Sequence, residues 1–126
     1  MARSVLLVDD EALILEGTAD MLTSLGCEVI MAGNGTEALA KLKADDRIEI
    51  LMTDINMPGL GGFELAEIAK RLRPRLHVIL VSGVETDGHG MPFIRKPFQE
   101  SDITRVMSQT TGLCYHYRVA ICCIAA

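Results

Sequence analysis

The stretch "SVLLVDDEALIL" at residues 4–15 decides how this sequence folds, because an apolar run ends abruptly there in three acids. "SVLLV" (residues 4–8) is short and continuously apolar, which is typical of a β-strand buried on both faces of a parallel sheet. Asp9, Asp10 and Glu11 follow directly, and apolar residues then resume. Neighbouring carboxylates repel one another, so this cluster predicts a positively charged partner.

Alternating strand and helix patterns continue along the rest of the chain. Apolar runs predict strands at residues 4–8, 27–33, 48–54, 76–83 and 93–98, the last of them broken by Pro97. Apolar residues at helical spacing predict helices at residues 11–25, 35–44, 63–73 and 100–110. This alternation indicates an α/β fold in which a parallel sheet is covered by helices on both faces.

Composition bounds the class of protein. The 126 residues suffice for one domain, with 49% apolar and 23% charged residues. The net charge of −5 argues against nucleic acid as a direct partner, since phosphate binding needs a basic face. Apolar runs stay well below the roughly 18 residues of a membrane span, and the first residues do not resemble a signal peptide. We therefore expect a cytoplasmic protein with no membrane partner, whose four cysteines are free thiols.

Polar residues follow the predicted strands at their carboxyl ends, where open parallel sheets bind ligands. The first strand is followed by Asp9 and Asp10, the third ends in Asp54, the fourth reaches Ser82 and the fifth Lys96. These five groups are far apart in the sequence. The sheet should nevertheless bring them together at one edge.

The chemistry of these groups suits a metal ion and a phosphoryl group. Three carboxylates favour a hard cation such as Mg²⁺, which would be the missing positive charge. Lys96 and Ser82 can bind the oxygens of an anion, and Asp54 beside a metal can attack phosphorus. Taken singly, an aspartate after a strand is more often a helix N-cap, and the serine and lysine more often solvated. The joint pattern, rather than any one residue, favours the site.

Four stretches carry a family resemblance: "LLVDDE", "LMTDINMPGLGGFEL", "VILVSG" and "FIRKPF", in that order. With them the sequence resembles the receiver domain of two-component response regulators over residues 4–109. The resemblance implies a doubly wound, flavodoxin-like (CheY-like) sheet of five parallel strands in the order 2-1-3-4-5. It also implies that Asp54 takes a phosphoryl group from a histidine of a partner kinase.

The resemblance assigns the remaining roles residue by residue. Asp10 would bind Mg²⁺ directly, Asp9 through water, and Asn56 through its main-chain carbonyl. Ser82 would be the switch hydroxyl and Phe93 the aromatic switch residue. Lys96 would pair with the phosphoryl group and be followed by a cis peptide bond at Pro97.

Two regions depart from the family pattern. Residues 83–95, between Ser82 and Lys96, are too few and too rich in glycine for a full fourth helix plus a strand, so we expect that helix to be short or missing. Residues 111–126 follow the receiver domain at residues 1–110 as an extension of uncertain structure. Three interpretations of this extension stay open: disorder, packing on its own domain, or exchange between chains in a homodimer.

We therefore expect a signalling domain that phosphorylates itself with Mg²⁺ and loses the group slowly, rather than an enzyme for an external substrate. Its partner would be a histidine kinase or a phosphotransfer protein. The alternative is the receiver module of a hybrid sensor kinase. A degenerate receiver that only binds a partner is less favoured, because all the residues that the chemistry needs are present. A Mg²⁺-dependent phosphatase with Asp54 as its nucleophile would need a second acid two residues later, where this sequence has Asn56.

Overall fold

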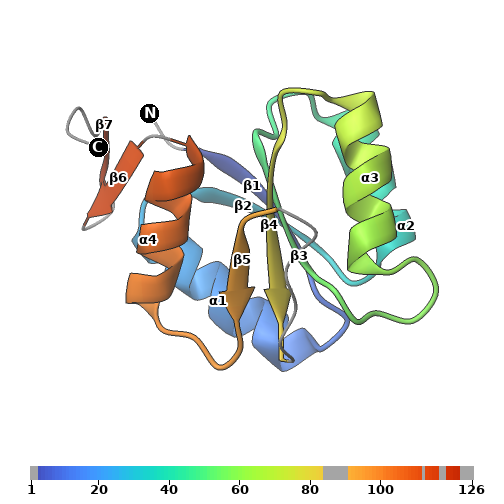
Figure 1. Ribbon diagram of the computed structural model, residues 1–126, viewed down its shortest axis with the longest axis horizontal. Coiled ribbons are helices and arrows are strands. Elements are labelled where there is room, and N and C mark those ends of the chain that lie inside the picture. Colours follow the sequence, from blue (N-terminus) through green and yellow to red (C-terminus); the bar gives the residue numbers. More distant parts are fainter. Residues whose placement is uncertain (1–2, 84–90, 112, 117–118, 123–126) are drawn as a thin grey trace.

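A five-stranded parallel sheet with helices on both faces forms the body of the protein (Figure 1). The computed structural model describes residues 3–83, 91–111, 113–116 and 119–122. The strands of the sheet lie in the order β2-β1-β3-β4-β5, as the sequence predicts. The elements are β1 (Ser4–Val8), α1 (Ala12–Ser24), β2 (Glu28–Ala32), α2 (Gly35–Ala44), β3 (Ile50–Asp54), α3 (Gly62–Leu72), β4 (His77–Ser82), β5 (Phe93–Arg95) and α4 (Glu100–Thr111).

Central strands of the sheet are buried on both faces, which explains their continuous apolar runs. Every residue of β1 and β3 is buried. Side chains alternate between the two faces, so Val5 and Leu7 join a core under α1 and α4 while Leu6 and Val8 join one under α2 and α3. Edge strand β2 is partly exposed. Because these strands run parallel, their carboxyl ends, and the acids found there, lie at one edge of the sheet.

Residues 83–92 connect β4 to β5, and residues 84–90 among them lie outside the described part of the chain. The short or missing fourth helix expected at residues 83–95 falls largely on that segment. Within the described ranges there are four helices, and none lies between β4 and β5. Strand β5 has three residues and ends before Lys96, so it is shorter than the stretch 93–98 predicted from the sequence.

The C-terminal extension continues beyond α4, which runs one residue past the predicted boundary at residue 110. Strands β6 (Leu113–His116) and β7 (Val119–Cys122) pair antiparallel with each other in a separate two-stranded sheet. They do not join the five-stranded sheet. The division into residues 1–110 and 111–126, and a homodimer built through the extension, stay predictions.

Arg73 joins the end of α3 to the connection between α2 and β3. Its guanidinium donates hydrogen bonds to the carbonyl oxygens of Leu42, Asp45 and Ile48. Replacing Arg73 with methionine would leave these partly buried acceptors without their charged donor. We expect the free energy of unfolding to fall by about 2 kcal/mol, measured by urea denaturation. Arg71→Met is the control, because that side chain is exposed; an equal loss there would contradict the role of Arg73.

Candidate functional site

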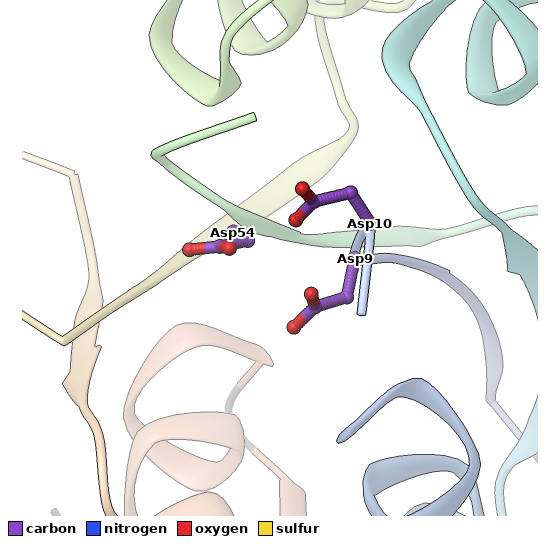
Figure 2. Close-up of side chains that lie close together, drawn as sticks. All are labelled: Asp9, Asp10 and Asp54. Carbon is purple, nitrogen blue, oxygen red and sulfur yellow. The ribbon is translucent and has the colours of Figure 1, made fainter. Parts of the chain in front are cut away.

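Three carboxylates meet at the carboxyl edge of the sheet, as the strand ends predict (Figure 2). Neighbouring strands β1 and β3 run parallel, and Val8 lies opposite Thr53. Asp9 follows Val8 and Asp54 follows Thr53, so the two aspartates lie side by side. One oxygen from each of Asp9, Asp10 and Asp54 lies within 4.8 Å of the others. Asp9 and Asp54 are only 5% and 6% exposed, whereas Asp10 is exposed. One face of this cluster therefore opens to solvent.

Lys96 supplies a positive charge to this cluster. Its Nζ lies 3.0 Å from Oδ2 of Asp9 and 3.5 Å from Oδ2 of Asp54. Its backbone N–H donates to the carbonyl of Ser82 at 2.7 Å, which fixes the start of the loop after β5 against β4. The family resemblance assigns Lys96 to a phosphoryl group, and the structure shows that it also pairs with the carboxylates. Three carboxylates against one ammonium still leave two negative charges, which a divalent cation would balance.

The protonation equilibria reflect this crowding. Burial raises the pKa of Asp54 above its usual value; the charge of Lys96 opposes this shift, and the charge of Asp9 adds to it. Burial tends to lower the pKa of Lys96, but its hydrogen bond to Asp9 and the charges of Asp54 and Asp9 outweigh burial and raise that pKa. Lys96 therefore stays charged at neutral pH. Because the pKa of Asp54 is raised, ionising this carboxyl lowers the stability of the folded state.

Helix capping does not account for the two aspartates after β1. The N-cap residue of α1 is Glu11, and its side chain makes no capping hydrogen bond. Asp9 instead accepts a hydrogen bond at Oδ1 from the backbone N–H of Glu11 at 3.0 Å, which leaves Oδ2 for Lys96. The carboxylate of Asp9 is thus fixed on both oxygens. This arrangement favours the interpretation of these acids as a site.

The loop after Asp54 folds tightly around it. The backbone N–H of Asn56 donates a hydrogen bond to the Asp54 carboxylate, while the Asn56 side chain is exposed. Met57 is buried in the core, and Gly59 has a φ of +75°, which favours glycine. Gly62, the first residue of α3, donates its N–H to the carbonyl of Ile55 at 2.9 Å. Asn56 is therefore hydrogen-bonded to Asp54 through its backbone. That its main-chain carbonyl binds a metal ion stays a prediction.

The two predicted switch residues lie on the last strands of the sheet. Ser82 is fully buried at the end of β4. Phe93 begins β5 opposite Leu80 and packs, partly buried, against the core under α2 and α3. The peptide bond between Lys96 and Pro97 is cis, as predicted. The placement of Ser82 and Phe93 is as expected, and their switching roles stay predictions.

A groove beside Lys96 is a feature that the sequence analysis missed. It has a volume of about 500 Å³ and is lined largely by apolar atoms of Ile14, Gly17, Thr18, Met21, Gly83, Lys96, Pro97 and Phe98. Helical spacing places Ile14, Thr18 and Met21 on one face of α1, and that spacing predicted the helix alone. Ile14 and Met21 are in fact only partly buried. The apolar spacing on α1 was visible in the sequence, but such spacing does not distinguish a buried core face from the wall of a groove.

The comparisons with known proteins agree with this geometry. The family model described as response regulator receiver domain matches residues 5–108. The chain belongs to this family. A curated relative of the receiver domain, the chemotaxis protein CheY of Thermotoga maritima, is 31% identical over 120 residues, which cover 88% of this chain and 99% of the relative.

Two solved structures extend the likeness of this receiver domain to three dimensions. The CheX–CheY–BeF3–Mg²⁺ complex of Borrelia burgdorferi matches with a TM-score of 0.79 and 26% identity, over 85% of this chain and 87% of that one. The receiver domain of the hybrid histidine kinase CckA matches with a TM-score of 0.75 and 30% identity, over 85% and 97%. Three other curated relatives are longer, and the match covers 35%, 22% and 46% of their lengths. None of the described helices is long and apolar enough to cross a membrane.

Proposed function

We propose that this receiver domain takes a phosphoryl group onto Asp54 from a histidine of a kinase or phosphotransfer protein, with Mg²⁺ bound, and acts as a cytoplasmic signalling switch. The observation that carries the proposal is the position of the Asp54 carboxylate. It lies 6% exposed at the sheet edge, grouped with the carboxylates of Asp9 and Asp10 and 3.5 Å from the ammonium of Lys96. The catalytic function is assigned to residues 1–110, with residues 111–126 as an extension.

The residues present fit a magnesium ion. Asp9, Asp10 and Asp54 offer only oxygen ligands and carry more negative charge than Lys96 balances, and Mg²⁺ prefers oxygen ligands. Asn56, tied to Asp54 through its N–H, would add a main-chain carbonyl. The similar CheX–CheY complex of Borrelia burgdorferi contains Mg²⁺ and BeF3, which supports the same choice. The bound ion would offset negative charge on the transferring group.

The transfer itself needs little from the protein beyond position and charge. An oxygen of Asp54 forms a bond to phosphorus while the bond from phosphorus to the donor imidazole nitrogen breaks, and the electron pair stays on that nitrogen. Lys96 binds one oxygen of the transferred group, and Ser82 donates a hydrogen bond to another oxygen of that group. Water later hydrolyses the acyl phosphate slowly. The chain thus acts once per signal rather than turning over an external substrate.

The apolar groove beside Lys96 supports a protein donor. Its walls come from α1, from Gly83 and from residues 96–98, so a segment bound there would lie next to Lys96, which itself contacts Asp54. A histidine carried on such a segment could approach the acceptor. The similarity to the CckA receiver favours, as a second candidate, a receiver module within a hybrid sensor kinase. The phosphatase alternative lacks its second acid, because Asn56 stands at that position.

Intact mass measured after incubation with Mg²⁺ and acetyl phosphate tests the proposal. We expect a mass increase of one phosphoryl group. The increase should be absent when a chelator removes Mg²⁺ from the incubation. Borohydride trapping of the acyl phosphate followed by peptide mass mapping should place it at residue 54. A folded protein that binds Mg²⁺ but gains no mass would contradict the proposal and favour a domain that only binds a partner.

A further inference from the structure

We propose that Gly35, the first residue of α2, positions the loop at residues 56–61 through its close contact with Leu60, and thereby supports the metal site. The inference rests on the proposed function, since it concerns how Mg²⁺ is held at Asp54 and Asn56. Gly35 touches neither the acids nor a bound group. It is a positioning residue that acts through Leu60.

The contact leaves no room for a larger residue. A Cβ atom built on Gly35 would lie 2.9 Å from both Cβ and Cδ2 of Leu60 and 3.0 Å from its Cγ. Carbon atoms pack at about 3.5–4.0 Å, so a methyl group here would have to displace Leu60. A new rotamer moves Cδ2 but leaves Cβ in place. The displacement must therefore reach the backbone of the loop.

The α2 side of the contact is held firmly. Oδ1 of Asn34 accepts the N–H of Glu37 at 2.8 Å, and Oε2 of Glu37 accepts the N–H of Gly33 at 3.3 Å, so both sides of the helix start are fixed. Just before it, the carbonyl of Ala32 accepts the N–H of Asp9 at 3.2 Å. The junction between β2 and α2 thus lies against both segments that carry the acids. It meets Asp9 through a hydrogen bond and the loop after Asp54 through Leu60.

The loop side has few other attachments. Met57 is buried at one end, while Pro58 and Gly59 are exposed, and Leu60 is the next side chain to enter the protein. Leu60 packs against the core under α2 and α3. The position of Leu60 therefore helps to set the backbone path between Met57 and Leu60. The carbonyl of Asn56 immediately precedes Met57, so a shift of the loop changes how it faces the carboxylates.

Three variants disturb the contact, and a fourth is a matched control. Gly35→Ala adds a methyl group against Leu60, Leu60→Ala removes Cγ and Cδ2 but keeps Cβ, and Leu60→Gly removes all three atoms. Gly33→Ala adds the same methyl group two residues earlier, where the nearest atom is Oε2 of Glu37 at 3.8 Å, an ordinary contact. Each is compared with the wild type by isothermal titration calorimetry with Mg²⁺ alone. Amide chemical shifts of residues 55–61 are recorded without metal.

We expect Gly35→Ala to weaken Mg²⁺ binding roughly tenfold, the lower end of the loss seen when support for a metal ligand is removed. Leu60→Ala should weaken it as well, and Gly33→Ala should leave it unchanged. In the double variant Gly35→Ala/Leu60→Gly, compared with Leu60→Gly alone, the effect of Gly35→Ala should vanish, because residue 60 then has no Cβ for the methyl group to meet. The amide shifts of residues 55–61 should move in Gly35→Ala and stay in place in Gly33→Ala.

Equal Mg²⁺ affinity in the wild type, Gly35→Ala and Leu60→Ala would overturn the inference while leaving the proposed function intact. So would a loss from Gly35→Ala that persists in full in the Leu60→Gly background, since Gly35 would then act through the helix. If Gly35→Ala does not fold, Leu60→Ala alone decides by the same criterion. Failure of the wild type itself to bind Mg²⁺ would count against the proposed function, and the metal-free amide shifts would still decide whether Gly35 positions the loop.

Discussion

Replacing Asp54 with asparagine is expected to abolish phosphoryl uptake and at the same time to raise the free energy of unfolding measured without Mg²⁺. The amide has nearly the shape of the carboxylate but cannot form the acyl phosphate. The gain in stability follows from the pKa of Asp54, which burial raises, with the charge of Asp9 adding to the shift against the opposing charge of Lys96. Lys96 keeps its partner at 3.0 Å, Asp9, in the variant.

The sign of the pH dependence follows from linkage. A carboxyl whose pKa is raised on folding binds its proton more tightly in the folded state, so its ionisation lowers stability as pH rises above its unfolded pKa of about 4. Asparagine cannot ionise and avoids this loss. The stability difference between Asp54→Asn and the wild type should therefore be largest at neutral pH. It should shrink as pH falls toward about 4.

Urea denaturation at a series of pH values and intact mass after acetyl phosphate treatment measure the two effects. Asp20→Asn, on the exposed surface of α1, is the control and should change neither. Continued uptake by Asp54→Asn would place the acceptor elsewhere. A less stable variant would show that the ion pair with Lys96 outweighs the burial of the carboxylate.

Gly62→Ala is expected to lower the free energy of unfolding by about 3 kcal/mol, the upper end of what overpacking usually costs. A Cβ on Gly62 would lie 2.3 Å from the carbonyl oxygen of Asp54 and 2.7 Å from Cα of Ile55. Both are backbone atoms, so no side chain can turn aside to make room. Gly62 lies in α3, where alanine would otherwise stabilise by up to about 1 kcal/mol. The expected change thus has the opposite sign to helix propensity.

The neighbouring glycine provides a sharp control for Gly62. A Cβ on Gly61 would lie no closer than 3.4 Å to any atom, at the carbonyl oxygen of Ile55. Gly61→Ala should therefore change the urea midpoint far less than Gly62→Ala. Similar losses from both variants would mean that the cost comes from the helix start in general rather than from the approach to Asp54. Stabilisation by Gly62→Ala would contradict the close packing itself.

The sequence predicted the meeting of Asp9, Asp54 and Lys96 because it follows from topology. Once parallel strands are identified from their apolar runs, their carboxyl ends must lie at one edge, whatever the side chains do there. The order of the strands came from the family resemblance and is confirmed. The pairing of Lys96 with the carboxylates was not predicted, since spacing along a chain does not reveal which of two anions a lysine contacts.

The close contacts of two glycines could not be predicted from the sequence either. Glycines at Gly35 and Gly62 looked like ordinary turn or helix-start residues, and only the three-dimensional approach of Leu60 and Asp54 shows why a methyl group does not fit. The β6–β7 pair was likewise not foreseen, because a short apolar stretch in the sequence is compatible with disorder, with packing on its own domain and with exchange between chains. The helix at α1 was predicted from its apolar spacing, and the groove beside Lys96 was not.

The attachment of Lys96 has a mechanical consequence for the edge of the sheet. Strand β5 is three residues long, so its ladder to β4 is short, and the N–H of Lys96 extends it by one bond to Ser82. The side chain of the same residue reaches Asp9 after β1 and Asp54 at the end of β3. The outermost strand is thereby tethered to the charges at the centre. A change in those charges therefore alters how firmly the edge strand is held.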